Sequence, residues 1–257
     1  MPIPSGAAPV DAVLFDLDDV LVPFHALSVW QWAWKPQGPA LGPRRAAAAF
    51  RRAVHAWDKR RWDGVTGRQP PADATALRTH LVETLEALAA RPLPAEEVEA
   101  VVRRVLHPAG EVERFPDVAP CLARLAAAHV RYGISTSLPG DSARWLLKRV
   151  GLPEAALLAT GDGPDPALPA RAAFKAAVAR LDVPAERVVY VGDLFWSDVH
   201  AAHRAGVPAL LLDRPDSWPR VALGRMRSLD ALESTLAAHA PGTGGPGPGD
   251  AAGGEPI

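Results

Sequence analysis

The 257-residue sequence has little cysteine, no excess of charge of one sign and no long hydrophobic run. Its single cysteine, Cys121, excludes a disulfide within the chain and is typical of a reducing compartment. The formal net charge is -1 and no dense run of lysine or arginine occurs, so we expect no nucleic-acid partner. No segment stays apolar and uncharged for about 18 residues, and the chain begins with neither a basic stretch nor an apolar run. We therefore expect a cytoplasmic protein that does not enter a membrane.

Short apolar runs, each followed by an amphipathic helical pattern, recur along the chain. They read "AVLFDL", "VRYGIST", "ALLAT", "RVVYVGD" and "PALLLD". Apolar strands that alternate with helices predict an α/β fold with a doubly wound, Rossmann-like parallel sheet covered on both faces. Residues 1–9 and the Gly/Pro-rich end of the chain, 237–257, are predicted to be flexible.

The first two expected strands are separated by a long stretch that contains no comparable apolar run. Residues 23–114 read as helices, with clear 3.6-residue periodicity in "LRTHLVETLEALAA". The stretch holds many arginines and five of the eight tryptophans, of which Trp30, Trp32 and Trp34 form one cluster. This pattern predicts a helical domain inserted into an α/β core that spans residues 10–22 and 115–236.

Acidic side chains follow two of the expected strands. Asp16 and Asp18 lie where the first strand ends, and Asp193 ends "RVVYVGD", with Asp198 shortly after it. In doubly wound sheets the ligand crevice lies beyond the carboxyl ends of the strands, so these side chains converge. Four carboxylates in one place repel one another unless a hard divalent cation such as Mg²⁺ lies between them. The strand "YGISTSLPG" supplies hydroxyls and amides of Thr136 and Ser137 to the same crevice for phosphate oxygens.

Three motifs together resemble those of the haloacid dehalogenase superfamily, in its branch with a helical cap inserted after the first strand. They are the Asp-x-Asp loop "FDLDDVL", the strand-ending hydroxyl in "GISTS", and the Gly-Asp-x-x-x-x-Asp loop in "VVYVGDLFWSDVHAAHRAGVPALLL". An isolated Asp-x-Asp would be weak evidence. Two acidic loops in the expected order, on strands of the expected kind, make the resemblance strong.

The resemblance implies a Mg²⁺-dependent phosphatase of small phosphorylated metabolites. Asp16 would attack phosphorus and form an aspartyl-phosphate, while Asp18 would protonate the leaving oxygen and later activate water. Asp16, the backbone carbonyl of Asp18, Asp193 and Asp198 would bind the metal, and Thr136 would bind a phosphoryl oxygen. The acid at position 18 favours phosphate esters over carbon-halogen bonds, because the dehalogenases of the superfamily lack an acid there.

One family feature is not evident. Relatives carry a lysine before the helix that leads to the second acidic loop, whereas "GDGPDPALPARAAFKAAVARL" has no basic residue in that register. Arg171 is our first candidate to replace the lysine and to bind the phosphoryl group, ahead of Lys175 and Lys148. A nearby cation is needed because the carboxylates and a phosphate leave excess negative charge around one metal ion.

Two alternatives stay open at this point. The chain could be a catalytically weak relative that binds a phosphorylated ligand or a protein partner, or it could be a phosphomutase. The sequence does not identify the substrate, the oligomeric state or the role of the cap tryptophans. Asp19, where many relatives have glycine, is expected to be a solvated loop residue, and Asp198 has a helix cap as its alternative role.

Overall fold

The computed structural model describes residues 10–23, 43–65, 68, 74–89, 91–106, 112–136, 138, 140–159, 171–221 and 224–238. These residues form a six-stranded sheet with the order β3-β2-β1-β4-β5-β6, in which every pair of neighbours is parallel. The strands are β1 Ala12–Asp16, β2 Arg131–Ser135, β3 Leu157–Ala159, β4 Val188–Gly192, β5 Ala209–Leu212 and β6 Arg225–Met226. The predicted doubly wound α/β fold is therefore confirmed.

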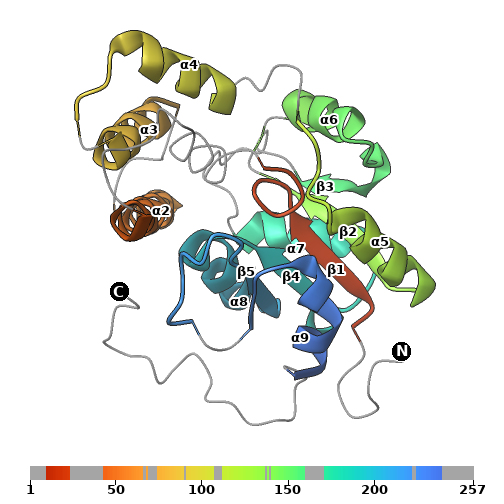
Figure 1. Cartoon of the computed structure of the whole chain (residues 1–257). Coiled ribbons are helices and arrows are strands. Elements are labelled where there is room, and N and C mark those ends of the chain that lie inside the picture. Colours follow the sequence, from red (N-terminus) through yellow and green to blue (C-terminus); the bar gives the residue numbers. More distant parts are fainter. Residues whose placement is uncertain are drawn as a thin grey trace.

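Helices cover both faces of the sheet (Figure 1). They are α5 Val118–Ala127, α6 Gly140–Arg149, α7 Arg171–Leu181, α8 Ala201–Arg204 and α9 Leu232–Ala238. Successive strand residues point to opposite faces, and the packing follows this alternation. Leu14 and Tyr190 pack with α7 and α8, whereas Phe15 and Val191 pack with α5, α6 and α9. Both faces are apolar because neither face meets water.

Three further helices lie between β1 and α5 in the chain and are grouped together in Figure 1. They are α2 Pro43–Val65, α3 Ala74–Ala89 and α4 Ala95–Leu106, called the helical insert below. The described residues of this stretch contain no strand, as the sequence predicts, while the exact domain boundaries stay a prediction. Trp57 and Trp62 are buried here, and the cluster of Trp30, Trp32 and Trp34 lies outside the described residues.

Two further expectations concern Cys121 and membrane-spanning helices. Cys121 is a buried free thiol on α5, where it packs between the helix and the sheet. No helix in the described ranges is long and apolar enough to cross a bilayer. Strand β6 was not predicted, because two residues are too few to give an apolar run.

Candidate active site

The loop after β1 turns back on itself within a few residues. The amides of Leu21 and Val22 both donate to the carbonyl of Leu17, at 3.1 Å each. Asp19 adopts a left-handed backbone with φ of 54°, and its amide donates to the carbonyl of Val22 at 2.7 Å. Asp19 is buried, so the expectation of a solvated loop residue is wrong. The tight turn places Asp19 inside the loop, where its charge acts on the neighbouring carboxylates.

Three carboxylates meet at the carboxyl ends of adjacent strands. Oxygen atoms of Asp16, Asp193 and Asp198 lie within 4.8 Å of one another. Asp16 ends β1 and Asp193 follows β4, and these two strands pair directly, so the sheet brings the first two together. Asp198 comes from a short π-helical segment, η3 Phe195–His200. Gly192 gives Asp198 room, because a Cβ on that glycine would lie 2.5 Å from Oδ2 of Asp198.

Burial and mutual repulsion make this cluster electrostatically unfavourable without a cation. Burial raises the pKa of Asp16 well above its usual range, and the charges of Asp198 and Asp18 raise it further. The pKa of Asp193 is raised for the same reasons, by burial first and then by Asp198. Oxygen ligands of an octahedral Mg²⁺ at about 2.1 Å lie roughly 3 to 4 Å apart. The donor set and its spacing therefore fit a hard divalent cation.

Asp198 is held in place by the loop that it follows. Its Oδ2 accepts a hydrogen bond from the amide of Leu194 at 3.0 Å, and the side chain is almost fully buried. Burial raises its pKa to about 6, although the charge of Arg61 opposes the shift. Asp198 lies in the first turn of η3, and Leu194, whose amide it binds, is the residue before that segment, so a capping contact at the start of η3 accompanies its place in the cluster.

Asp18 has a different environment from the three clustered carboxylates. The hydroxyl of Thr136, which follows β2, donates to Oδ2 of Asp18 at 3.3 Å. The other oxygen, Oδ1, is buried and has no hydrogen-bond partner among the described residues. Burial raises the pKa of Asp18 to about 7, helped by the charge of Asp19. A carboxyl group that titrates near neutral pH can both give and take a proton. Its side chain is not part of the three-carboxylate cluster, and the expected metal contact through its backbone carbonyl stays a prediction.

The remaining predicted residues are not brought to the cluster by any described contact. Ser137 lies outside the described residues. Arg171 begins α7, but its side chain is also outside them. Lys148 and Lys175 are exposed on α6 and α7, which does not suit a group that must face buried carboxylates.

The structure adds a basic residue that the sequence did not single out, Arg61 on α2. Burial disfavours its charge, but Asp198 and Asp16 nevertheless raise the pKa of Arg61 above its usual value. The charge of Arg61 in turn opposes the rise in the pKa of Asp16, Asp18 and Asp193, which burial causes. The segment "AWDKRRWDGV" gave no sign of this, because one arginine among many in a helix has no distinguishing spacing. The proximity of Arg61 to the carboxylates follows only from the way in which α2 packs on the α/β core.

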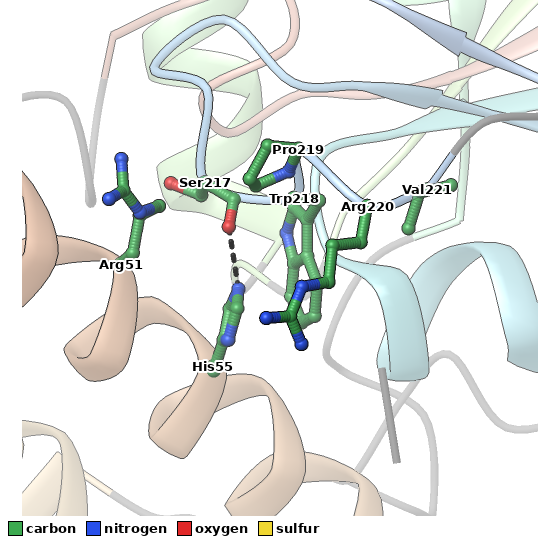
Figure 2. A pocket seen from close by; sticks show the side chains of 7 residues that line it. All are labelled: Arg51, His55, Ser217, Trp218, Pro219, Arg220 and Val221. Carbon is green, nitrogen blue, oxygen red and sulfur yellow. Dashed lines mark hydrogen bonds between the residues drawn. The ribbon is translucent and has the colours of Figure 1, made fainter. Parts of the chain in front are cut away.

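Helix α2 also contacts the loop after β5. His55 donates from Nε2 to the carbonyl of Ser217 at 2.7 Å, and its ring stacks on Trp218 with centroids 3.8 Å apart (Figure 2). A cavity of about 220 Å³ lies beside this contact, lined by Arg51, His55 and Ser217–Val221. Burial lowers the pKa of His55, which favours the neutral ring. Helix α2 therefore meets the α/β core at two places, at Arg61 beside the carboxylates and at His55 beside the loop after β5.

Comparisons with known proteins agree with the motifs. A family model described as haloacid dehalogenase-like hydrolase matches residues 10–206. The phosphoglycolate phosphatase of Rhodospirillum rubrum is 31% identical over 170 residues, which is 65% of this chain and 64% of that protein. The chain therefore matches somewhat less than two thirds of that relative's length.

Two solved structures show the same fold. The L-2-haloacid dehalogenase from Xanthobacter autotrophicus aligns with a TM-score of 0.56 at 18% identity, over 90% of this chain and all of that one. A haloacid dehalogenase-like family hydrolase from Xanthomonas campestris aligns with a TM-score of 0.52, also at 18% identity, over 92% of this chain and 95% of that one. At such low identity these structures bear on the fold alone.

Proposed function

The chain belongs to the haloacid dehalogenase-like hydrolases, and from this premise we propose that it is a Mg²⁺-dependent phosphatase of a small phosphorylated metabolite. One observation carries the choice of phosphatase within the family. Asp18 lies two residues after Asp16, is held by Thr136, and has a pKa raised to about 7. Hydrolysis of an alkyl phosphate needs such a proton donor, because the leaving alkoxide oxygen must be protonated. The resemblance implies that dehalogenases lack an acid at this position.

The proposed reaction has two steps at phosphorus. A carboxylate oxygen of Asp16 attacks phosphorus, the bond to the ester oxygen breaks, and the proton of Asp18 passes to the departing alcohol. Asp18 then takes a proton from water, whose oxygen attacks the aspartyl-phosphate, and the bond between phosphorus and Asp16 breaks to release phosphate. Thr136 would bind a phosphoryl oxygen from the end of β2 once its hydroxyl, which donates to Asp18 in the structure, turns to the substrate.

The metal site of this proposal uses Asp16, Asp193 and Asp198, the three side chains that the structure brings together. When bound there, Mg²⁺ would neutralise the carboxylates and the phosphoryl oxygens as charge develops. We further propose that the helical insert acts as a cap, which excludes water and selects the substrate. The insert contacts the loop after β5 through the hydrogen bond between His55 and Ser217.

The test is a hydrolysis screen over phosphorylated metabolites, with and without Mg²⁺. The phosphatase matched in Rhodospirillum rubrum carries phosphoglycolate in its name, so 2-phosphoglycolate belongs in the first panel. The proposal expects phosphate release that requires Mg²⁺ and is lost in Asp16→Asn. Tight binding of a phosphorylated compound without turnover would favour the ligand-binding alternative. Conversion of one phosphate isomer into another without free phosphate would favour a phosphomutase.

A further inference from the structure

The buried carboxylates and a bound phosphate need a positive group close to them. Three carboxylates are clustered, Asp18 adds a fourth, and the substrate would bring a phosphate. Among the side chains that the structure describes near the sequence position of the family lysine, Lys175 is exposed, and so is Lys148 on α6. The side chain of Arg171 lies outside the described residues, whereas a described basic side chain whose charge acts on these carboxylates, Arg61, belongs to the helical insert.

Helix α2 is fixed on the segment that carries Asp198. Asp58 of α2 is fully buried, and its carboxylate accepts three hydrogen bonds from the start of η3. The donors are the amide of Trp196 at 2.7 Å, the amide of Ser197 at 2.8 Å and the hydroxyl of Ser197 at 2.7 Å. Amides at the start of a helical segment lack partners within it, so a residue of the insert completes a segment of the core.

Arg61 follows Asp58 by three residues and therefore lies one turn further along the same side of α2. The next residue, Trp62, contacts η3 as well, with its ring 5.1 Å from that of His200 in an edge-to-face arrangement. Arg61 is thus bracketed by two contacts with the segment that holds Asp198. Its charge acts on Asp198, Asp16, Asp58 and Asp193.

We propose that Arg61 is the cationic residue of this active site, in place of the core lysine of relatives, and that Asp58 is the positioning residue that brings it there. This inference rests on the proposed phosphatase function. A guanidinium can give two parallel hydrogen bonds to phosphoryl oxygens and stays charged at all working pH values. Because the cation belongs to the insert, the site is complete only while α2 is docked. The chemical step is therefore coupled to closure.

The first experiment compares Arg61→Gln and Arg61→Lys with the control Arg52→Gln, which removes an exposed arginine from the same helix. Loss of one group that stabilises the transferring phosphoryl typically slows turnover about 100-fold or more. We expect that loss in Arg61→Gln on the best substrate of the screen, a partial loss in Arg61→Lys and none in Arg52→Gln. Wild-type turnover in Arg61→Gln, with a loss in Arg171→Gln, would overturn the inference.

A binding measurement tests the same inference independently of turnover. By titration calorimetry, Arg61→Gln should bind Mg²⁺ more tightly than wild type, because a positive charge no longer competes for the carboxylates. It should bind inorganic phosphate more weakly in the presence of Mg²⁺. Arg52→Gln should change neither affinity. If the wild type hydrolyses no substrate, the proposed function fails. The two affinities still show whether Arg61 acts on the site. Affinities for Mg²⁺ and phosphate in Arg61→Gln equal to those of the wild type would reject that role of Arg61.

The positioning role of Asp58 is tested by combining substitutions. If Asp58 acts through Arg61, then Asp58→Asn slows turnover, and the double variant with Arg61→Gln is no slower than Arg61→Gln alone. Independent, multiplying losses would reject the positioning role. Thermal unfolding identifies a variant that fails to fold, and Asp58→Glu, which keeps the carboxylate, then takes its place in the same cycle. Asp63→Asn serves as control, since Asp63 pairs with Lys59 on the same helix.

Discussion

Gly192 and Asp198 approach so closely that no side chain fits between them. A Cβ on Gly192 would lie 2.5 Å from both Cβ and Oδ2 of Asp198. Glycine at the end of β4 is therefore a requirement of the carboxylate cluster rather than of the strand. The loop amide of Leu194, which binds the same Oδ2, completes the support of Asp198.

The first prediction concerns Gly192→Ala, which should displace Asp198 from the cluster. We expect Mg²⁺ affinity to fall by about 10- to 100-fold, the range for loss of the support around a metal ligand. Titration calorimetry measures this. Gly206→Ala is the control, since Gly206 has φ of 83° and open space around it. That variant should lose about 1 kcal/mol of stability and keep its Mg²⁺ affinity. Unchanged Mg²⁺ binding in Gly192→Ala would remove Asp198 from the site.

The second prediction concerns Asp18→Asn, which keeps the volume of the side chain and removes its proton. On an alkyl phosphate, turnover should fall by about 10² to 10⁴, as expected for the loss of a general acid and base. On p-nitrophenyl phosphate, whose leaving group needs no proton, the first step should survive and the second should slow. A burst of p-nitrophenol and an enzyme with the mass of one added phosphoryl group would show this. Equal losses on both substrates, without a burst, would contradict the assignment.

The third prediction concerns Asp193→Asn, which removes one of three mutually repelling carboxylates. Without metal the variant should melt at a higher temperature than wild type, because burial and repulsion penalise the charged cluster. In millimolar Mg²⁺ the order should reverse, since only the wild type gains stability by binding the ion. Differential scanning calorimetry in EDTA and in Mg²⁺ measures both. A Mg²⁺ shift as large in the variant as in wild type would place the metal elsewhere.

The fourth prediction concerns the buried ion pair between Asp117 and Arg214, which joins the start of α5 to the loop after β5. Arg214 donates two hydrogen bonds to the carboxylate, at 2.7 and 2.9 Å, and the Ser228 hydroxyl and the Leu229 amide add two more. Burial alone would raise the pKa of Asp117, but Arg214 lowers it below the ordinary 3.8. Asp117→Asn should cost about 3 kcal/mol at neutral pH.

The pH dependence of that cost follows from the sign of the shift. A depressed pKa means that the folded state favours the carboxylate, so the stabilisation is fully present above the unfolded pKa. It declines as the pH falls below 3.8 and through the lower folded value. Urea unfolding from pH 7 to pH 3 should show the gap between wild type and Asp117→Asn shrinking. Asp141→Asn, which alters an exposed pair with Arg144, should show no comparable gap.

Much of the sheet could be predicted from sequence, because strands buried on both faces leave near-continuous apolar runs. The same logic placed Asp16 and Asp193 together, since parallel strands end at one edge. It failed for Asp19, because the fold of a tight loop decides whether a loop acid meets water. It also missed Arg61, because proximity there depends on how a helix docks, and no local spacing records that. Asp58 was missed for the same reason.

The apolar core does not stop at the boundary of the insert. One continuous cluster joins Leu14 and Tyr190 of the sheet to Trp62, Leu81 and Val98 of the insert. Separating the insert from the sheet would expose these apolar side chains to water, and closing the insert again would bury them. Apolar surface removed from water lowers the heat capacity. A ligand that draws the insert shut should therefore bind with a more negative heat-capacity change than its own contact area would produce, so a calorimeter could detect closure from the temperature dependence of the binding enthalpy.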